Sequence, residues 1–183
     1  MKQLLALVLF VLIACGASPK QEVTPEKPVQ DKQFPDAYLG IYKGDLKISN
    51  PNGSQTLPME FHLLQTDSTG VYNYTIVYGE GELKQTRAYK LLTVNKATGE
   101  YVVDEDNGIL LDAKWVENTL YFSFEVQDNL LTTTERFYDN AMDFEITFSS
   151  KKNKKQTGSE QLPVISYPIT VVQKAHLVKQ SQE

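Results

Sequence analysis

Hydrophobic and polar residues alternate in short runs over residues 36–178, which is typical of β-strands that bury one face. In the first run, Tyr42 and Leu46 fall on one face, while Lys43 and Lys47 fall on the other. Gly, Asn and Asp mark turns between the runs, and no run keeps a helical period. The expected strands lie at residues 38–48, 59–63, 72–78, 89–91, 100–105, 109–117, 119–126, 130–138, 142–149 and 167–178.

Tight turns join most of these runs, so consecutive strands should be antiparallel neighbours. A sheet of about ten strands would leave two exposed edges, and closing it into a barrel removes them. A longer loop is expected at residues 79–86, and a polar loop at 151–158 precedes the last run, which can pair with the first. The sequence therefore predicts an all-β fold, an antiparallel up-and-down meander barrel of about ten strands.

Charged residues fall opposite the apolar ones along these strands, which places the apolar face inside the barrel and water outside. Six tyrosines fall on the inner face, and buried phenol groups need hydrogen-bond partners or water. A wet or ligand-filled cavity would provide them, and so would a filled core whose hydroxyls reach the rims. The six are Tyr38, Tyr42, Tyr72, Tyr74, Tyr78 and Tyr101.

The N-terminus carries a different pattern, with Lys2, an apolar run over residues 4–14, and Ala14 directly before Cys15, the only cysteine. This arrangement resembles the lipobox of bacterial lipoproteins. The resemblance implies cleavage before Cys15, a diacylglycerol on its thiol and an acylated, for example palmitoylated, N-terminus. The polar, proline-containing stretch that follows is typical of an extended tether. We expect a signal peptide at 1–14, a lipidated tether at 15–35, the barrel at 36–178 and a tail at 179–183.

Composition and the lipobox together predict where the protein acts. No later apolar run is long enough to cross a bilayer as a helix, so attachment to the membrane would depend on the lipid. The net charge is −5, and it becomes about −6 without the leader, which argues against nucleic acid as a partner. Gly16 after the modified cysteine favours the outer membrane of the cell envelope, with its face and any protein partner undetermined.

The first strand contains Gly40-Ile41-Tyr42, a glycine followed two residues later by an aromatic residue. A meander barrel that opens this way resembles the calycin superfamily of lipocalins and fatty-acid-binding proteins. The lipocalin motif has Trp at the position of Tyr42, and the last strand has Lys174 and His176 in place of its usual arginine. The resemblance implies a barrel that encloses a small hydrophobic ligand.

The residues offer little for catalysis. His62 and His176 are expected on outer faces, and no nucleophile motif or phosphate-binding loop is present. The acidic stretch at residues 104–108 lacks the later ligands of a calcium loop and is interpreted as a hairpin tip. The lysine-rich segment 151–155 is interpreted as a solvated loop, with contact to anionic headgroups as the alternative. We therefore expect no enzyme activity, no metal and no cofactor.

Arginine occurs only at positions 87 and 136, and a guanidinium inside a barrel could pair with a ligand carboxylate. The alternative is that Arg136 pairs with neighbouring surface acids and that Arg87 lies in water at the start of a strand. The sequence thus predicts a lipid-anchored envelope protein that binds a small hydrophobic or amphipathic ligand, or else a filled barrel that serves interaction or assembly. The candidate ligand-binding residues are Tyr42, Tyr74, Arg87, Trp115, Phe124, Arg136 and Phe144.

Overall fold

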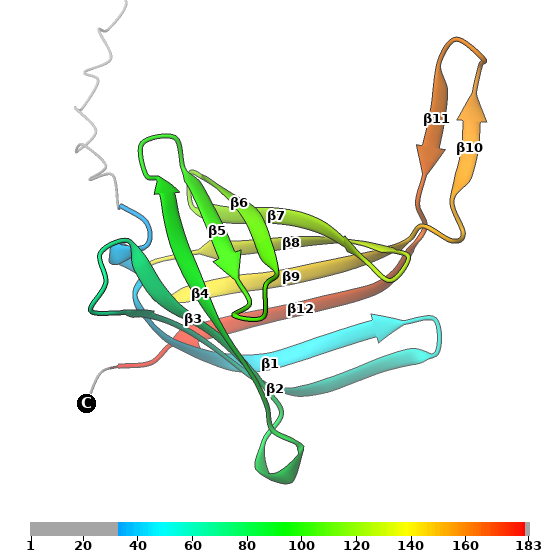
Figure 1. Ribbon diagram of the computed structural model, residues 1–183. Helices are drawn as coiled ribbons and strands as arrows, with labels where there is room; N and C mark the ends of the chain where they lie inside the picture. The colour runs from blue at the N-terminus through cyan, green and yellow to red at the C-terminus, as the bar shows by residue number, and fades with distance from the viewer. Residues whose placement is uncertain (1–32, 182–183) are drawn as a thin grey trace, which may run out of the picture. The chain divides into compact units, whose positions relative to one another are not determined.

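Ten antiparallel strands form a closed barrel in the computed structural model, which describes residues 33–181 (Figure 1). A separate two-stranded hairpin, β10–β11, is inserted before the last strand, and two 3₁₀ helices, η1 and η2, complete the fold. The barrel strands are β1 (Gly40–Asn50), β2 (Gly53–Gln65), β3 (Val71–Tyr78), β4 (Gln85–Asn95), β5 (Glu100–Asp104), β6 (Leu110–Val116), β7 (Thr119–Val126), β8 (Asn129–Phe137), β9 (Ala141–Ser150) and β12 (Ile169–Lys179). The remaining elements are η1 (Asp36–Tyr38), η2 (Gly81–Leu83), β10 (Lys155–Gly158) and β11 (Pro163–Ser166).

The sheet is a meander from β1 to β9, and β12 pairs with both β9 and β1 to close the ring. The two closing strands approach closely at Gly44, where a Cβ atom would lie 2.4 Å from the carbonyl oxygen of His176. A residue with a side chain would therefore push β1 away from β12 at this point. The predicted fold class and the pairing of the last strand with the first are confirmed.

Two expected segments differ from the structure. Tyr38 belongs to η1 rather than to the first strand, because the chain turns at Pro35 before the sheet begins at Gly40. The polar loop expected at residues 151–158 is instead the start of the β10–β11 hairpin, in which every strand residue is exposed. Since neither of its faces is buried, the hairpin lacks the alternation by which the other strands were recognised.

The inner face of the barrel holds a core of aromatic and aliphatic side chains. Five of the six tyrosines expected inside are buried, and Tyr78 is half-buried. The two histidines pair with carboxylates on the outer side, His62 with Glu60 at 2.8 Å and His176 with Asp143 at 2.7 Å. The predicted separation of an apolar interior from a polar exterior is confirmed.

One end of the barrel is closed by the segment that leads into β1. Phe34 is 3% exposed, and its ring stacks on Trp115 with 3.9 Å between the centroids. The hydroxyl of Tyr101 donates to the Phe34 carbonyl at 3.0 Å, and that of Tyr42 donates to the Tyr38 carbonyl at 2.5 Å. The expected boundary between tether and barrel, at residue 36, leaves Phe34 in the tether, whereas the structure packs Phe34 in the core. A single aromatic residue among polar ones gives no periodic signal, so the sequence does not indicate its burial.

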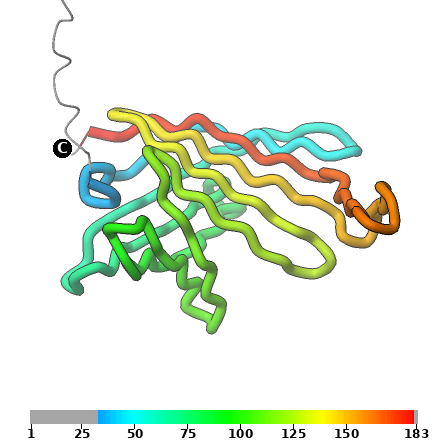
Figure 2. The backbone as a smooth tube through the Cα atoms, turned by 90° about the horizontal axis from the view of Figure 1, so that it is seen from above, coloured from blue at the N-terminus to red at the C-terminus, as the bar shows by residue number. Residues whose placement is uncertain are grey.

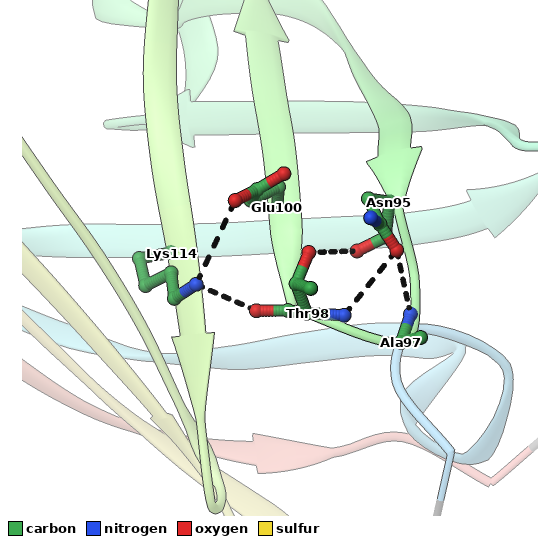
Figure 3. A network of polar contacts seen from close by, with 5 residues as sticks. All are labelled: Asn95, Ala97, Thr98, Glu100 and Lys114. Carbon is green, nitrogen blue, oxygen red and sulfur yellow. Dashed lines mark hydrogen bonds and ion pairs between the residues drawn. The ribbon is translucent and has the colours of Figure 1, made fainter.

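The turn between β4 and β5 holds the closing segment from outside. Oδ1 of Asn95 accepts hydrogen bonds from the backbone N–H groups of Ala97 and Thr98, which shapes the turn (Figure 3). Nζ of Lys114 donates to the Thr98 carbonyl at 2.6 Å and so ties the turn to β6. Lys96, at the tip, forms an ion pair with Asp36 of η1 at 2.7 Å. The ion pair draws the pKa of Asp36 below its ordinary value.

Both views place η1 and the final residues of β12 at the closed end, with the β1–β2 and β10–β11 hairpins at the other (Figures 1 and 2). Residues 33–181 contain no helix that is long and apolar enough to cross a membrane. Cys15, the leader and most of the expected tether lie outside the described residues.

Candidate ligand-binding cavity

The barrel encloses a cavity of about 1210 Å³. Exposed residues of the β1–β2 hairpin, the β3–β4 connection with η2, and the β5–β6 and β7–β8 turns line its mouth. The closing segment around Phe34 does not line it, and the exposed lining residues of these loops form its mouth. The walls are largely apolar and include Leu46, Ile76, Phe122, Phe124, Phe144 and Ile146.

Three polar side chains lie at the inner part of the cavity wall or directly behind it. Tyr74 lines the cavity from β3, and its hydroxyl donates a hydrogen bond to Oε1 of Glu135 on β8. Glu135 is 0% exposed, and its Oε2 has no hydrogen-bond partner among residues 33–181. Thr133, which lines the cavity two residues before Glu135 on the same face of β8, is 1% exposed and its hydroxyl is likewise unpartnered within the described chain.

Burial sets the ionisation of this group. Removal from water raises the pKa of Glu135 to about 8, although the hydrogen bond from Tyr74 acts in the opposite direction. Burial also raises the pKa of Tyr74 far above its ordinary value, and the adjacent Glu135 adds to the shift. Near pH 7, Glu135 is therefore mainly a neutral carboxylic acid that can donate as well as accept a hydrogen bond.

The mouth carries charged groups of both signs. Arg87 is exposed and lines the mouth from the start of β4, together with the acids Glu80, Glu105 and Glu125. Burial raises the pKa of Tyr89 above its ordinary value, and the nearby carboxylate of Glu105 raises it further. Lys151 forms an ion pair with Glu125 at the outer rim.

The structure brings together four of the seven residues that were expected to bind a ligand. Tyr74, Arg87, Phe124 and Phe144 line the cavity. Arg87 pairs with Ile76 in the β3–β4 register and lines the mouth, and it is also exposed to water near the start of β4, as the alternative expects.

The other three residues lie elsewhere, so their assignment to the ligand site is corrected. Tyr42 and Trp115 belong to the closed end, where Tyr42 bonds to Tyr38 and Trp115 stacks on Phe34. Arg136 is exposed on the outer face, where its Nε donates to Oγ1 of Thr119 at 3.3 Å. It alternates with the buried Glu135 and Phe137 on β8, so the alternative that places Arg136 on the outer surface is confirmed.

Sequence reasoning missed Glu135, Thr133 and Glu105. The alternation that directs Leu131 and Phe137 inward also directs Thr133 and Glu135 inward, so a strict reading of the period would have found both. Glu105 is part of the expected acidic hairpin tip, and it lines the cavity mouth together with Ile109 of the same turn. Within residues 33–181, no group of three or more His, Cys, Asp or Glu side chains could hold a metal ion.

Comparison with known proteins finds a similar fold among solved structures but no protein that is similar in sequence. No family model matches the chain, and no curated protein matches it in sequence. Among solved structures, it is similar to an S-type phycobiliprotein lyase from Guillardia theta, with a TM-score of 0.56 over 81% of this chain and 91% of the lyase, at 5% identity. Since that protein is named a lyase, it lends no support to the expectation that this chain is not an enzyme. At this identity the likeness extends to the fold alone: the chain shares the barrel architecture of that lyase.

Proposed function

We propose that this protein binds a small hydrophobic or amphipathic molecule inside its barrel and acts as a lipid-anchored protein of the bacterial cell envelope. The observation that carries the proposal is the cavity of about 1210 Å³ with one open end. Pockets that hold small molecules commonly measure about 300–1000 Å³ and combine apolar walls with a few polar groups. The cavity fits this description and exceeds the usual volume.

The side chains that line the cavity argue for an occupant. A filled barrel that acts only through its loops would pack its inward aromatic rings against one another, as Phe34, Trp115 and Phe137 do at the closed end. In the cavity, Phe122 and Phe124 stack on each other in the wall, and they border the open volume of about 1210 Å³. This difference between the two ends favours ligand binding over the alternative of a purely structural barrel.

The anchor is the second part of the proposal, and it rests on Ala14-Cys15 and the apolar run before it. Two or three acyl chains on one residue hold a protein firmly to a bilayer, whereas a single chain binds marginally. A lipidated Cys15 would therefore hold the barrel at the envelope without a membrane-spanning segment. The sequence after the cysteine favours the outer membrane.

Titration with a neutral apolar fluorophore, N-phenylnaphthylamine, tests the binding function. We expect saturable enhancement of its fluorescence by the purified full-length protein, with about one site per chain. Native mass spectrometry of protein taken directly from cells should also show an added mass that organic extraction removes. If the fluorophore fails to bind and no added mass is found, the barrel does not serve as a ligand carrier.

A further inference from the structure

The inner face of β8 holds two polar groups that the protein does not satisfy by itself. Oγ1 of Thr133 and Oε2 of Glu135 have no hydrogen-bond partner in the part of the chain that the structure describes, and both residues are at most 1% exposed. Leaving a buried polar group without a partner is unfavourable, and such groups in folded proteins are nearly always paired. Thr133 lines the cavity and Glu135 follows it two residues later on the same face of β8, which points to a partner that comes from outside the chain.

The hydrogen bond from Tyr74 determines what this partner must offer. Oε1 of Glu135 already accepts from the Tyr74 hydroxyl, so the proton of the neutral acid is carried by Oε2. Oε2 is then a donor, and the hydroxyl of Thr133 can donate or accept. The complementary ligand atom is an oxygen that accepts hydrogen bonds, as in a hydroxyl or carbonyl group.

The charges around the cavity disfavour an anion. One arginine lines it, Arg87, an exposed residue near the start of β4 that pairs with Ile76, two positions from Tyr74 on β3. Three glutamates line the mouth beside it. A carboxylate that entered as far as Thr133 would lose its hydration near the buried Glu135, while Arg87 is exposed to water at the mouth, and such a loss is costly in an apolar interior.

We propose that Thr133 and Glu135 form a subsite for an uncharged hydroxyl or carbonyl oxygen at the buried end of an otherwise apolar ligand. The ligand class is thus a neutral lipid alcohol or ketone, and fatty-acid anions are excluded from it. Its apolar body would lie along Phe122, Phe144 and Ile146, toward the mouth. This inference deepens the proposed ligand-binding function and depends on it.

Displacement of N-phenylnaphthylamine by decanol, decane and decanoate tests the subsite. Thr133→Val removes the hydroxyl but keeps the shape, and one hydrogen bond of this kind corresponds to about a threefold to tenfold change in affinity. We expect the substitution to weaken the binding of decanol by this factor and to change the affinity for decane by no more than about twofold. Thr132→Val, on the exposed outer face of β8, is the matched control and should change neither affinity.

Glu135 provides a second pair of variants. Glu135→Gln keeps a hydrogen-bond donor, so its affinity for decanol should be within about twofold of that of the wild type. Glu135→Leu has no donor, and its affinity for decanol should fall by about the same factor as that of Thr133→Val. Circular dichroism verifies that each variant is folded. Three results would each overturn the subsite. The affinity for decanol could be unchanged in Thr133→Val and Glu135→Leu, the affinity for decane could fall as much as that for decanol, or decanoate could bind as tightly as decanol. If the wild type binds the fluorophore but one of these results is found, only the subsite is contradicted and the proposed binding function stands. If the wild type binds no fluorophore, the proposed function and the subsite are both contradicted.

Discussion

Tyr74 and Glu135 are joined by a hydrogen bond across the interior of the barrel, although 61 positions separate them in the chain. The bond links β3 to β8, two strands that are not neighbours in the sheet. It satisfies the tyrosine hydroxyl and one carboxyl oxygen, and it leaves the second carboxyl oxygen without a protein partner. The carboxyl group is therefore held in place through one of its two oxygens.

Stability should fall with rising pH because of Glu135. Its pKa is 4.5 in the unfolded chain and about 8 in the folded protein, so between these values the folded state retains a proton that the unfolded state has released. The contribution is fully present below pH 4.5 and is lost as pH rises through about 8, at roughly 1.4 kcal/mol per pH unit. Glu135→Gln should remove this slope, so its advantage in free energy of unfolding over the wild type should grow from pH 5 to pH 8.

Urea denaturation at several pH values measures this difference. Glu82→Gln replaces an exposed carboxylate in η2 and serves as the control, which should follow the wild-type curve. Parallel curves for Glu135→Gln and the wild type would show that Glu135 ionises in the folded protein as it does in water.

Phe34 should contribute to stability as a core residue. Its ring contacts Trp115, Tyr101 and Phe137, and replacing such a buried ring with alanine destabilises proteins by about 3–5 kcal/mol. We expect Phe34→Ala to lower the free energy of unfolding by this amount, measured by chemical denaturation. Leu83→Ala, at a position that is 83% exposed, should change it by less than about 0.5 kcal/mol. If Phe34→Ala lowers the free energy of unfolding no more than the control does, Phe34 is not a core residue and belongs to the tether.

Filling the cavity should abolish binding without unfolding the protein. Leu111 of β6 lines the cavity, and its neighbour Asp112 is exposed on the outer face. Leu111→Trp adds bulk to space that a ligand would use, so it should weaken binding of N-phenylnaphthylamine by at least about tenfold. Asp112→Trp adds the same ring outside and should leave binding unchanged. Equal binding by both variants would place the probe outside the barrel.

Cys15 should be required for membrane attachment if the lipobox is processed. Cys15→Ala removes the acceptor thiol, so the protein should move from the membrane fraction to the soluble fraction in high salt. Ser18→Ala changes a nearby polar residue and should leave the distribution unaltered. Metabolic labelling with a radioactive fatty acid should label the wild type and the control alone. A Cys15→Ala protein that stays with membranes in high salt would contradict the anchor.

The architecture of the barrel could be predicted from the sequence because its signal is repetitive. Each strand repeats the same alternation, and short turns between the strands allow few topologies, so an error of one or two residues at an end changes nothing. The runs at residues 119–126 and 142–149 correspond closely to β7 and β9. The β10–β11 hairpin could not be predicted in this way because both of its faces are exposed, so its sequence does not alternate.

The site was harder to predict because it depends on single residues. Glu135 was overlooked since acidic residues are expected in water, and only burial between neighbouring strands gives it a raised pKa. Arg87 and Arg136 look alike in sequence, yet one lines the mouth and the other lies outside. Phe34 lies in a polar stretch, and apart from the nearby Tyr38 its aromatic partners come from strands more than sixty positions away.

The two ends of the barrel can tolerate different kinds of change. Both ends of the described chain meet at the closed end, where the N–H of Gln180 donates to the Ile41 carbonyl and Lys179 lies over the Tyr42 ring. The mouth is bordered by connections such as residues 79–84 and 127–128, which can vary in length while the strands keep their register. A family of barrels with altered selectivity could therefore be engineered from this scaffold by grafting loops at one end, while fusions to either terminus of the fold stay clear of the entrance.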